Sequence, residues 1–160
     1  MVPSLAILFL SQVHSGGSIE AHHLDFIPRL AEARALMDHL SLHSMIDLSD
    51  GLGKDLREIC TQSQVAAELD ANAIPLRSNI KQLPKAEALH RALADGEDFE
   101  LCFTVSEADA EKLSRDPSLP QCHRIGRIMP GQGLYWAEAR GNRIPIQSFG
   151  YEHQGGTEDV

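Results

Sequence analysis

The sequence predicts an α+β or α/β domain, in which strands and helices intermix. Two observations support this class. Short apolar runs, some alternating with polar residues, are separated by segments whose apolar residues recur at spacings of three and four. The chain has 160 residues, of which 42% are hydrophobic, enough for one domain or two small ones around an apolar core.

The first expected strand is the apolar run Leu5–Leu10. It is too short to cross a membrane, because a spanning helix needs about 20 apolar residues. No Lys or Arg precedes it, as a secretory signal peptide would require. We therefore expect a buried strand and no membrane partner.

A helix is expected next, with Pro28 in its first turn, where the missing N–H costs little. From Arg29 onward the spacing predicts one apolar face that carries Leu30, Ala33, Met37 and Leu40. Residues 41–44 are expected to break this helix. Residues 45–48 then form a short predicted strand, because Ile46 and Leu48 share one face at a period of two.

The middle of the chain predicts two further helices and two strands. The second helix carries Leu52, Leu56 and Ile59 at spacings of four and three. A strand at 65–69 and a third helix over Lys85–Ala94 follow, and Asp95-Gly96 is a typical stop signal. Apolar and polar residues alternate over 99–105, which predicts a strand.

The last third predicts a capped helix followed by strands. Ser106 is placed to cap a helix that ends near Ser114. Strands are expected at 124–129, 134–139 and 144–146, with a hairpin turn at residues 141–142. The polar tail, 154–160, is expected to be disordered.

Charge and cysteine content limit the possible partners and the compartment. The formal net charge of −9 repels phosphate backbones, so nucleic acid is not an expected partner. The three cysteines, Cys60, Cys102 and Cys122, form no CxxC pair. This pattern predicts reduced thiols in the cytoplasm, without a disulfide framework or a structural zinc site.

The most informative segment is residues 47–50, which we call the acidic loop. It lies where a predicted strand runs into a helix, so Asp50 stands at or near the helix N-cap. Carboxylates of Asp47 and Asp50 suit Mg²⁺, Ser49 suits a phosphate oxygen, and Gly51 lets a ligand approach the backbone. The alternative is a plain N-cap at Asp50 beside a solvated strand residue at Asp47.

A second acidic segment, residues 96–100, lies between a helix end and a predicted strand. Charges at the mouth of a strand commonly face a cleft, where Glu97 or Asp98 would attract an amine or a cationic ring. The alternative is an acidic turn that keeps the end of the strand soluble.

Three ordered segments make the pattern specific: IDLSDGLGKDL at 46–56, ADGEDFELCFTV at 94–105 and GYEH at 150–153. Together they resemble the second half of thiamine-monophosphate kinases, which carry IDxSDGLxxDL, GGEDYEL and GYDH-like segments. The stretch GGSIEAHHLDFIPRLAEA at 16–33 resembles the region before the first of these. This sequence departs from the pattern at Asp95, Phe99 and Asp25, where the family has Gly, Tyr, and Arg or Pro.

The resemblance implies the carboxy-terminal domain of the aminoimidazole ribonucleotide synthase-like fold, and ATP-dependent phosphorylation of thiamine monophosphate to thiamine diphosphate. It also implies Mg²⁺, ATP as co-substrate, and a homodimer. The alternatives are another ATP-dependent enzyme of the same superfamily, or a non-catalytic metabolite-binding module derived from it.

Residue by residue, the resemblance implies Mg²⁺ ligands at Asp47 and Asp50, an ATP contact at Ser49, and thiamine contacts at Glu97 and Tyr151. The alternative for Tyr151 is an aromatic residue that packs the last strand. The resemblance also matches three residues to the family without giving them a firm role: Arg29, Asp55 and Asp98. For Arg29 the alternative is a surface ion pair at a helix start.

Domain boundaries are expected as follows: residual strand and loop at 1–20, the carboxy-terminal domain at 21–153, and the tail beyond. The family's amino-terminal ATP-binding domain has no counterpart in these 160 residues. Phosphoryl transfer depends on positioning and charge neutralisation from both domains. We therefore expect little or no kinase activity from the chain by itself.

Overall fold

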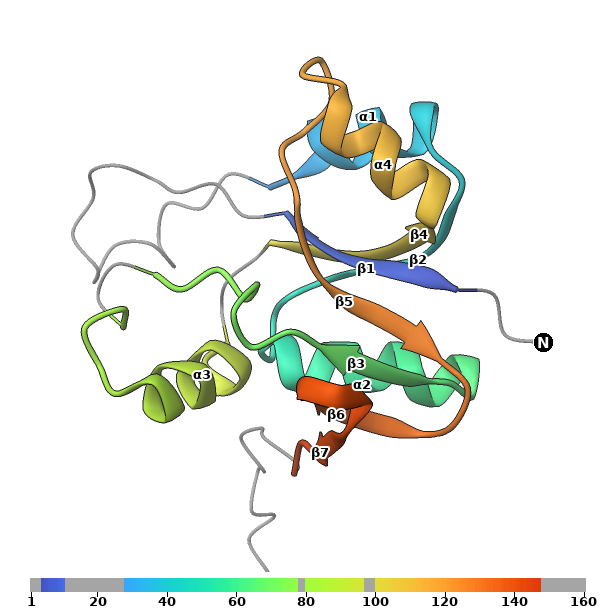
Figure 1. Ribbon diagram of the computed structural model, residues 1–160. Helices are drawn as coiled ribbons and strands as arrows, with labels where there is room; N and C mark the ends of the chain where they lie inside the picture. Colours follow the sequence, from blue (N-terminus) through green and yellow to red (C-terminus); the bar gives the residue numbers. More distant parts are fainter. Residues whose placement is uncertain (1–3, 11–27, 78–79, 97–99, 148–160) are drawn as a thin grey trace, which may run out of the picture.

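One mixed sheet of seven strands forms the centre of the computed structural model, which describes residues 4–10, 28–77, 80–96 and 100–147 (Figure 1). The strands lie in the order β2-β4-β1-β5-β3-β6-β7. They span Leu5–Leu10 (β1), Leu42–Asp47 (β2), Ala66–Leu69 (β3), Leu101–Ser106 (β4), His123–Met129 (β5), Gly133–Ala137 (β6) and Arg143–Pro145 (β7). β3 and β6 are parallel, and the other neighbouring strands are antiparallel.

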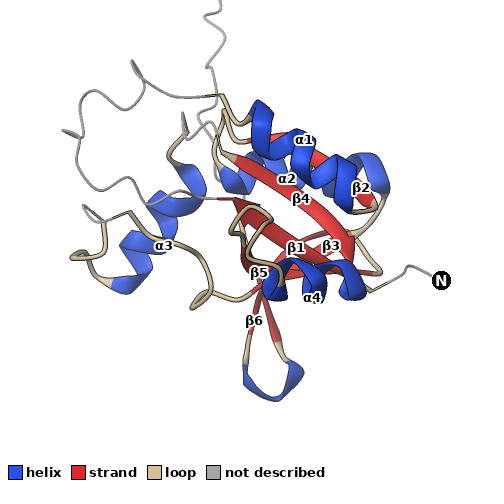
Figure 2. Cartoon of the chain, turned by 90° about the horizontal axis from the view of Figure 1, so that it is seen from above, coloured by secondary structure: helices blue, strands red, loops and turns tan. Residues whose placement is uncertain are grey.

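Four α-helices cover the two faces of this sheet in the described ranges. They span Leu30–His39 (α1), Leu52–Ser63 (α2), Lys85–Ala94 (α3) and Glu107–Arg115 (α4). α1 and α4 lie on one face, and α2 and α3 on the other, as Figures 1 and 2 show. The predicted α+β class is confirmed. None of the helices described is long and apolar enough to cross a membrane.

β1 is a central strand, because it pairs with β4 on one side and β5 on the other. Its alternate residues enter two different apolar clusters: Leu5, Ile7 and Phe9 face α2, and Ala6, Leu8 and Leu10 face α1 and α4. Burial on both faces explains why the sequence shows a continuous apolar run instead of alternation. The strand was expected at a domain boundary, whereas it belongs to the same sheet as the rest.

The rotation of α1 differs from the prediction. Leu36 and Leu40 are buried, whereas Leu30 is 72% exposed and Met37 58% exposed. Spacings of three and four fit two overlapping faces of this helix equally well. The buried side chain of Arg29, just before the helix, favours the face through Leu36.

Two boundaries also differ from the sequence prediction. β2 begins at Leu42, within the segment expected to be a break, because residues 42–44 extend the pairing with β4 through an irregular register. Between β6 and β7, a short 3-10 helix at Ala139–Gly141 takes the place of a tight hairpin turn. The predicted α3 range, Lys85–Ala94, is confirmed, as is the Ser106 cap, whose hydroxyl accepts a hydrogen bond from the Asp109 N–H.

Candidate functional site

The acidic loop connects β2 to α2 and is anchored at its middle. Asp47 is the last residue of β2, and Leu48 is fully buried in the core beneath the loop. Its neighbours Ser49 and Asp50 are exposed. Alternating burial therefore directs the polar side chains of the loop to solvent, where a ligand can reach them.

Asp50 does not cap α2 with its side chain. Gly51 is the N-cap, with φ of 101°, and no side chain makes a capping hydrogen bond there. The Asp50 carboxylate instead contacts the Lys54 ammonium at 2.7 Å, with about half of each side chain exposed. This hydrogen bond raises the pKa of Lys54. The alternative that Asp50 is a plain N-cap is therefore wrong, because its carboxylate makes no capping hydrogen bond and lies at the surface of the loop.

Gly51 is required by its surroundings as well as by its backbone angle. A Cβ at this position would lie 2.8 Å from the Leu93 carbonyl oxygen, at the carboxyl end of α3. The same carbonyl would lie 3.1 Å from a Cβ on Gly53. α3 therefore packs directly on the start of α2, and the glycines permit this approach.

Asp55 lies beneath the acidic loop and is only 6% exposed. Its Oδ2 accepts a hydrogen bond of 3.1 Å from the Asp50 backbone N–H. Burial raises the pKa of the Asp55 carboxyl, and the charges of Asp50 and Asp47 raise it further, while backbone N–H groups of Asp50 and Ser49 oppose the shift. Asp55 thus holds the backbone of the loop from below.

Sequence reasoning gave Asp55 no firm role, although a signal was present. Asp55 falls on the apolar face of α2 with Leu52, Leu56 and Ile59, all buried. A carboxylate at such a position needs hydrogen-bond donors when the helix packs. The backbone N–H groups of the nearby turn between strand and helix can serve as these donors.

The second acidic segment lies against the acidic loop at both of its described ends. A Cβ on Gly96 would be 2.6 Å from the Ser49 carbonyl oxygen. At the other end, the Glu100 carbonyl accepts a hydrogen bond of 2.9 Å from the Leu48 N–H. β2 and β4 continue this contact, with Asp47 opposite Leu101. Two segments that are separate in sequence therefore form one surface.

Three of the predicted site residues, Glu97, Asp98 and Tyr151, lie outside the described residues, as does Asp25. Asp47, Ser49 and Asp50 lie where β2 leads into α2. Residues 96 and 100, on either side of Glu97, contact this loop.

Arg29 is buried, which differs from the surface ion pair considered for it. The guanidinium Nε lies 3.0 Å from Glu100 Oε2, and Nη2 lies 2.9 Å from Glu100 Oε1. Nη1 donates to Glu32 at 3.3 Å. These partners, Glu100 above all, raise the pKa of Arg29. Arg29 is thus fully engaged within the fold.

The carboxylates of the loop fit a magnesium ion that keeps part of its water shell. Within the described residues, no three His, Cys, Asp or Glu side chains gather as a complete metal site. Mg²⁺ commonly uses one or two carboxylates, with phosphate oxygens and water completing the octahedron. Asp47 and Asp50 match that donor set, and Lys54 already shows that a cation is accepted at Asp50.

Fold and site together define an α+β domain with an acidic loop between a strand and a helix. Residues 8–136 match the family described as AIR synthase related protein, C-terminal domain. The chain belongs to this family.

Curated relatives of the chain are thiamine-monophosphate kinases. The enzyme of Pyrococcus horikoshii is 37% identical over 119 residues, which cover 74% of this chain and 36% of the relative. The enzyme of Buchnera aphidicola from Acyrthosiphon pisum is 38% identical over 149 residues, 91% of this chain and 46% of the relative. The chain therefore spans less than half the length of these relatives.

Solved structures share the fold. Thiamine-monophosphate kinase from Stenotrophomonas maltophilia superposes with a TM-score of 0.65 at 26% identity, covering 88% of this chain and 51% of that one. AaThiL complexed with AMPPCP and TMP gives a TM-score of 0.70 at 20% identity, covering 96% of this chain and 52% of that one.

Proposed function

We propose that this chain is the substrate- and metal-binding half of a thiamine-monophosphate kinase. The enzyme would transfer the γ-phosphoryl group of ATP to thiamine monophosphate and release thiamine diphosphate. The main support is the contact of the acidic loop with the second acidic segment, through the Leu48–Glu100 hydrogen bond and the approach of Gly96 to Ser49. The identity to curated kinases over most of the chain supports the choice of substrate.

In this proposal the acidic loop handles the phosphates. Asp47 and Asp50 would hold Mg²⁺, which when bound neutralises charge on the transferred phosphoryl group. The Ser49 hydroxyl would donate to ATP. Asp55 accepts the Asp50 N–H and would hold these groups in a fixed position relative to α2. AaThiL has been obtained with AMPPCP and TMP, a pair of ligands consistent with these roles.

The second acidic segment would handle the thiamine ring. Glu97 would place a carboxylate near the cationic heterocycle, and Tyr151 would stack on it. Gly96, which precedes Glu97 in the sequence, contacts Ser49 of the acidic loop. The ring and the phosphate of one small molecule would then be held by adjoining segments.

We also propose a cytoplasmic location and a homodimer for the complete enzyme. All three cysteines are free thiols, which agrees with a reducing compartment. The dimer rests on the resemblance alone.

Ligand binding tests the proposal directly. Thermal shift and calorimetry with thiamine monophosphate plus Mn²⁺ should show binding to the 160-residue chain. The variant Asp47→Asn/Asp50→Asn should weaken Mn²⁺ binding by about tenfold or more. Asp38→Asn, which removes an exposed carboxylate from α1, is the control and should bind as the parent does.

Other outcomes point elsewhere. Binding of a different phosphorylated metabolite would favour another enzyme of the superfamily or a binding module. Turnover in an ATP-coupled assay is expected to be very low, since only part of the charge-neutralising groups is present. Normal turnover from the purified chain would contradict that expectation.

A further inference from the structure

We propose that the buried Arg29–Glu100 ion pair is a positioning device that holds the second acidic segment in register with the acidic loop. The proposal rests on the proposed function, because the two segments are the thiamine side and the metal side of that site. In this view the pair sets the separation between the ring and the phosphate of the substrate.

The geometry of the pair fixes both partners. Two parallel hydrogen bonds, of 2.9 and 3.0 Å, join the guanidinium of Arg29 to the carboxylate of Glu100. A planar fork of this kind fixes orientation as well as distance. The third nitrogen of Arg29 is held by Glu32 on the first turn of α1. Rotation of either side chain would break at least one of these bonds.

The backbone of Glu100 carries this restraint to the acidic loop. Its carbonyl accepts the Leu48 N–H, and the next residue, Leu101, stands opposite Asp47. Arg29 therefore binds the side chain of the residue whose own carbonyl joins the two segments. Gly96, at the other end of the second acidic segment, contacts Ser49.

Stability alone does not explain the pair. A buried ion pair contributes little net stability, and apolar residues of similar size often serve as well or better. Among the ion pairs of the described residues, this one has both side chains less than a tenth exposed, at 6% and 8%. Its desolvation cost is therefore high, which makes orientation the better explanation for its position at the edge of the site.

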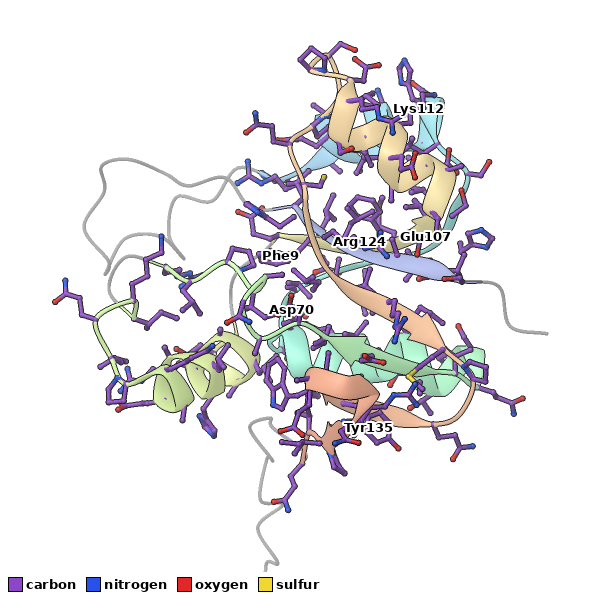
Figure 3. The ribbon with its side chains drawn as sticks, in the orientation of Figure 1. Phe9, Asp70, Glu107, Lys112, Arg124 and Tyr135 are labelled. Atoms are coloured by element: carbon purple, nitrogen blue, oxygen red, sulfur yellow. The ribbon has the colours of Figure 1, made fainter. Side chains whose placement is uncertain are left out.

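The molecule offers a matched control. Arg124 and Glu107 also form a two-bond ion pair, through Nη1 and Nη2 at 2.6 and 2.8 Å, but at the surface, with side chains 49% and 40% exposed (Figure 3). Arg124 lies on β5, and Glu107 opens α4, on the face of the sheet opposite to α2. Neither residue contacts the acidic loop among the interactions of the described residues.

The decisive variant is Arg29→Met/Glu100→Leu, which replaces the pair with apolar side chains. The midpoint of chemical denaturation should be unchanged or raised. Amide hydrogen exchange should become about tenfold faster in residues 47–51 and at residues 100 and 101, with the rest of the sheet unaffected. Affinity for thiamine monophosphate with Mn²⁺ should fall at least about tenfold. Binding of Mn²⁺ alone should change little, because Asp55 still holds the loop.

The control Arg124→Met/Glu107→Leu should leave exchange in both segments and ligand affinity as in the parent. Unchanged exchange at residues 100 and 101 of the Arg29→Met/Glu100→Leu variant would overturn the proposal. If that variant does not fold, Glu100→Gln keeps the size and one acceptor, and should give the same local increase in exchange. Failure of the parent chain to bind thiamine monophosphate would count against the proposed function, while the exchange result would still decide the role of the pair.

Discussion

At the residue scale, Asp55 gives the site a specific pH dependence. Its pKa is raised above the ordinary 3.8, mainly by burial and then by Asp50 and Asp47. The folded chain therefore binds the Asp55 proton more tightly than the unfolded chain does. Its contribution to stability is complete below 3.8 and is lost as pH rises through the raised pKa.

Asp55→Asn should remove this loss of stability with rising pH. The difference in unfolding free energy between variant and parent should shift in favour of Asn as pH rises from about 4 toward neutrality. A constant offset against Asn is expected, because the amide has one acceptor oxygen for the backbone N–H groups of Asp50 and Ser49, whereas the carboxylate has two. Urea denaturation over a pH series measures both the constant offset and the pH-dependent part of the difference in unfolding free energy. Parallel curves for variant and parent would contradict this reading of Asp55.

Gly51 is a second residue whose replacement should change the unfolding free energy by a predictable amount. Gly51→Ala should lower the unfolding free energy by about 2 kcal/mol or more, because φ is 101° and the new Cβ would meet the Leu93 carbonyl oxygen. Gly141→Ala is the control, since φ is 79° there but nothing lies within 4 Å. It should cost only about 1 kcal/mol. Equal losses would show that α3 does not pack on Gly51 as described.

At the element scale, the start of α4 depends on one hydroxyl. Ser106 accepts the Asp109 N–H at 3.1 Å and donates to the Asp109 carboxylate at 3.0 Å. Ser106→Ala should lower the unfolding free energy by about 1 kcal/mol. Ser114→Ala, an exposed change near the other end of the helix, should stay within about 0.5 kcal/mol. Equal unfolding free energies for the two variants would contradict the capping role of Ser106.

Elements differed in how well their patterns predicted them. The extents of β1 and α3 followed from an apolar run and a stop signal. The buried face of α1 could not be predicted from its pattern, since its apolar residues fit two rotations of the helix about its axis. Arg29, just before the helix, contacts Glu100, which lies 71 positions away in the sequence. The start of β2 was also missed, because pairing with β4 extends a segment whose own residues predict a break.

At the scale of the whole molecule, the three thiols report on global unfolding. Burial raises the pKa to about 11 for Cys60, about 12 for Cys102 and about 12 for Cys122. At pH 8, alkylation of the native chain should be about 100-fold slower than in denaturant, because the thiolate is the nucleophile. Cys122, which is partly exposed, should react first, and Cys102 should react only on unfolding. Mass spectrometry of partly labelled chain identifies the order.

Rapid labelling of Cys102 in the native chain would mean that the sheet opens locally around β4. Strand β4 lies between β2 and β1, and Cys102 belongs to the cluster that packs under α2. Such opening would also separate Leu48 from Glu100, so the result bears on the site as well as on the core.

The sequence by itself determined the α+β class, most elements and the polar residues of the acidic loop, because these depend on local periodicity and on motifs of neighbouring residues. Only the tertiary structure decided that the acidic loop and the second acidic segment adjoin. It also decided that Arg29 is buried against Glu100 and that Asp55 supports the loop. These contacts form when β2 pairs with β4 and α2 packs on the sheet. They depend on the arrangement of distant segments, which no local pattern encodes.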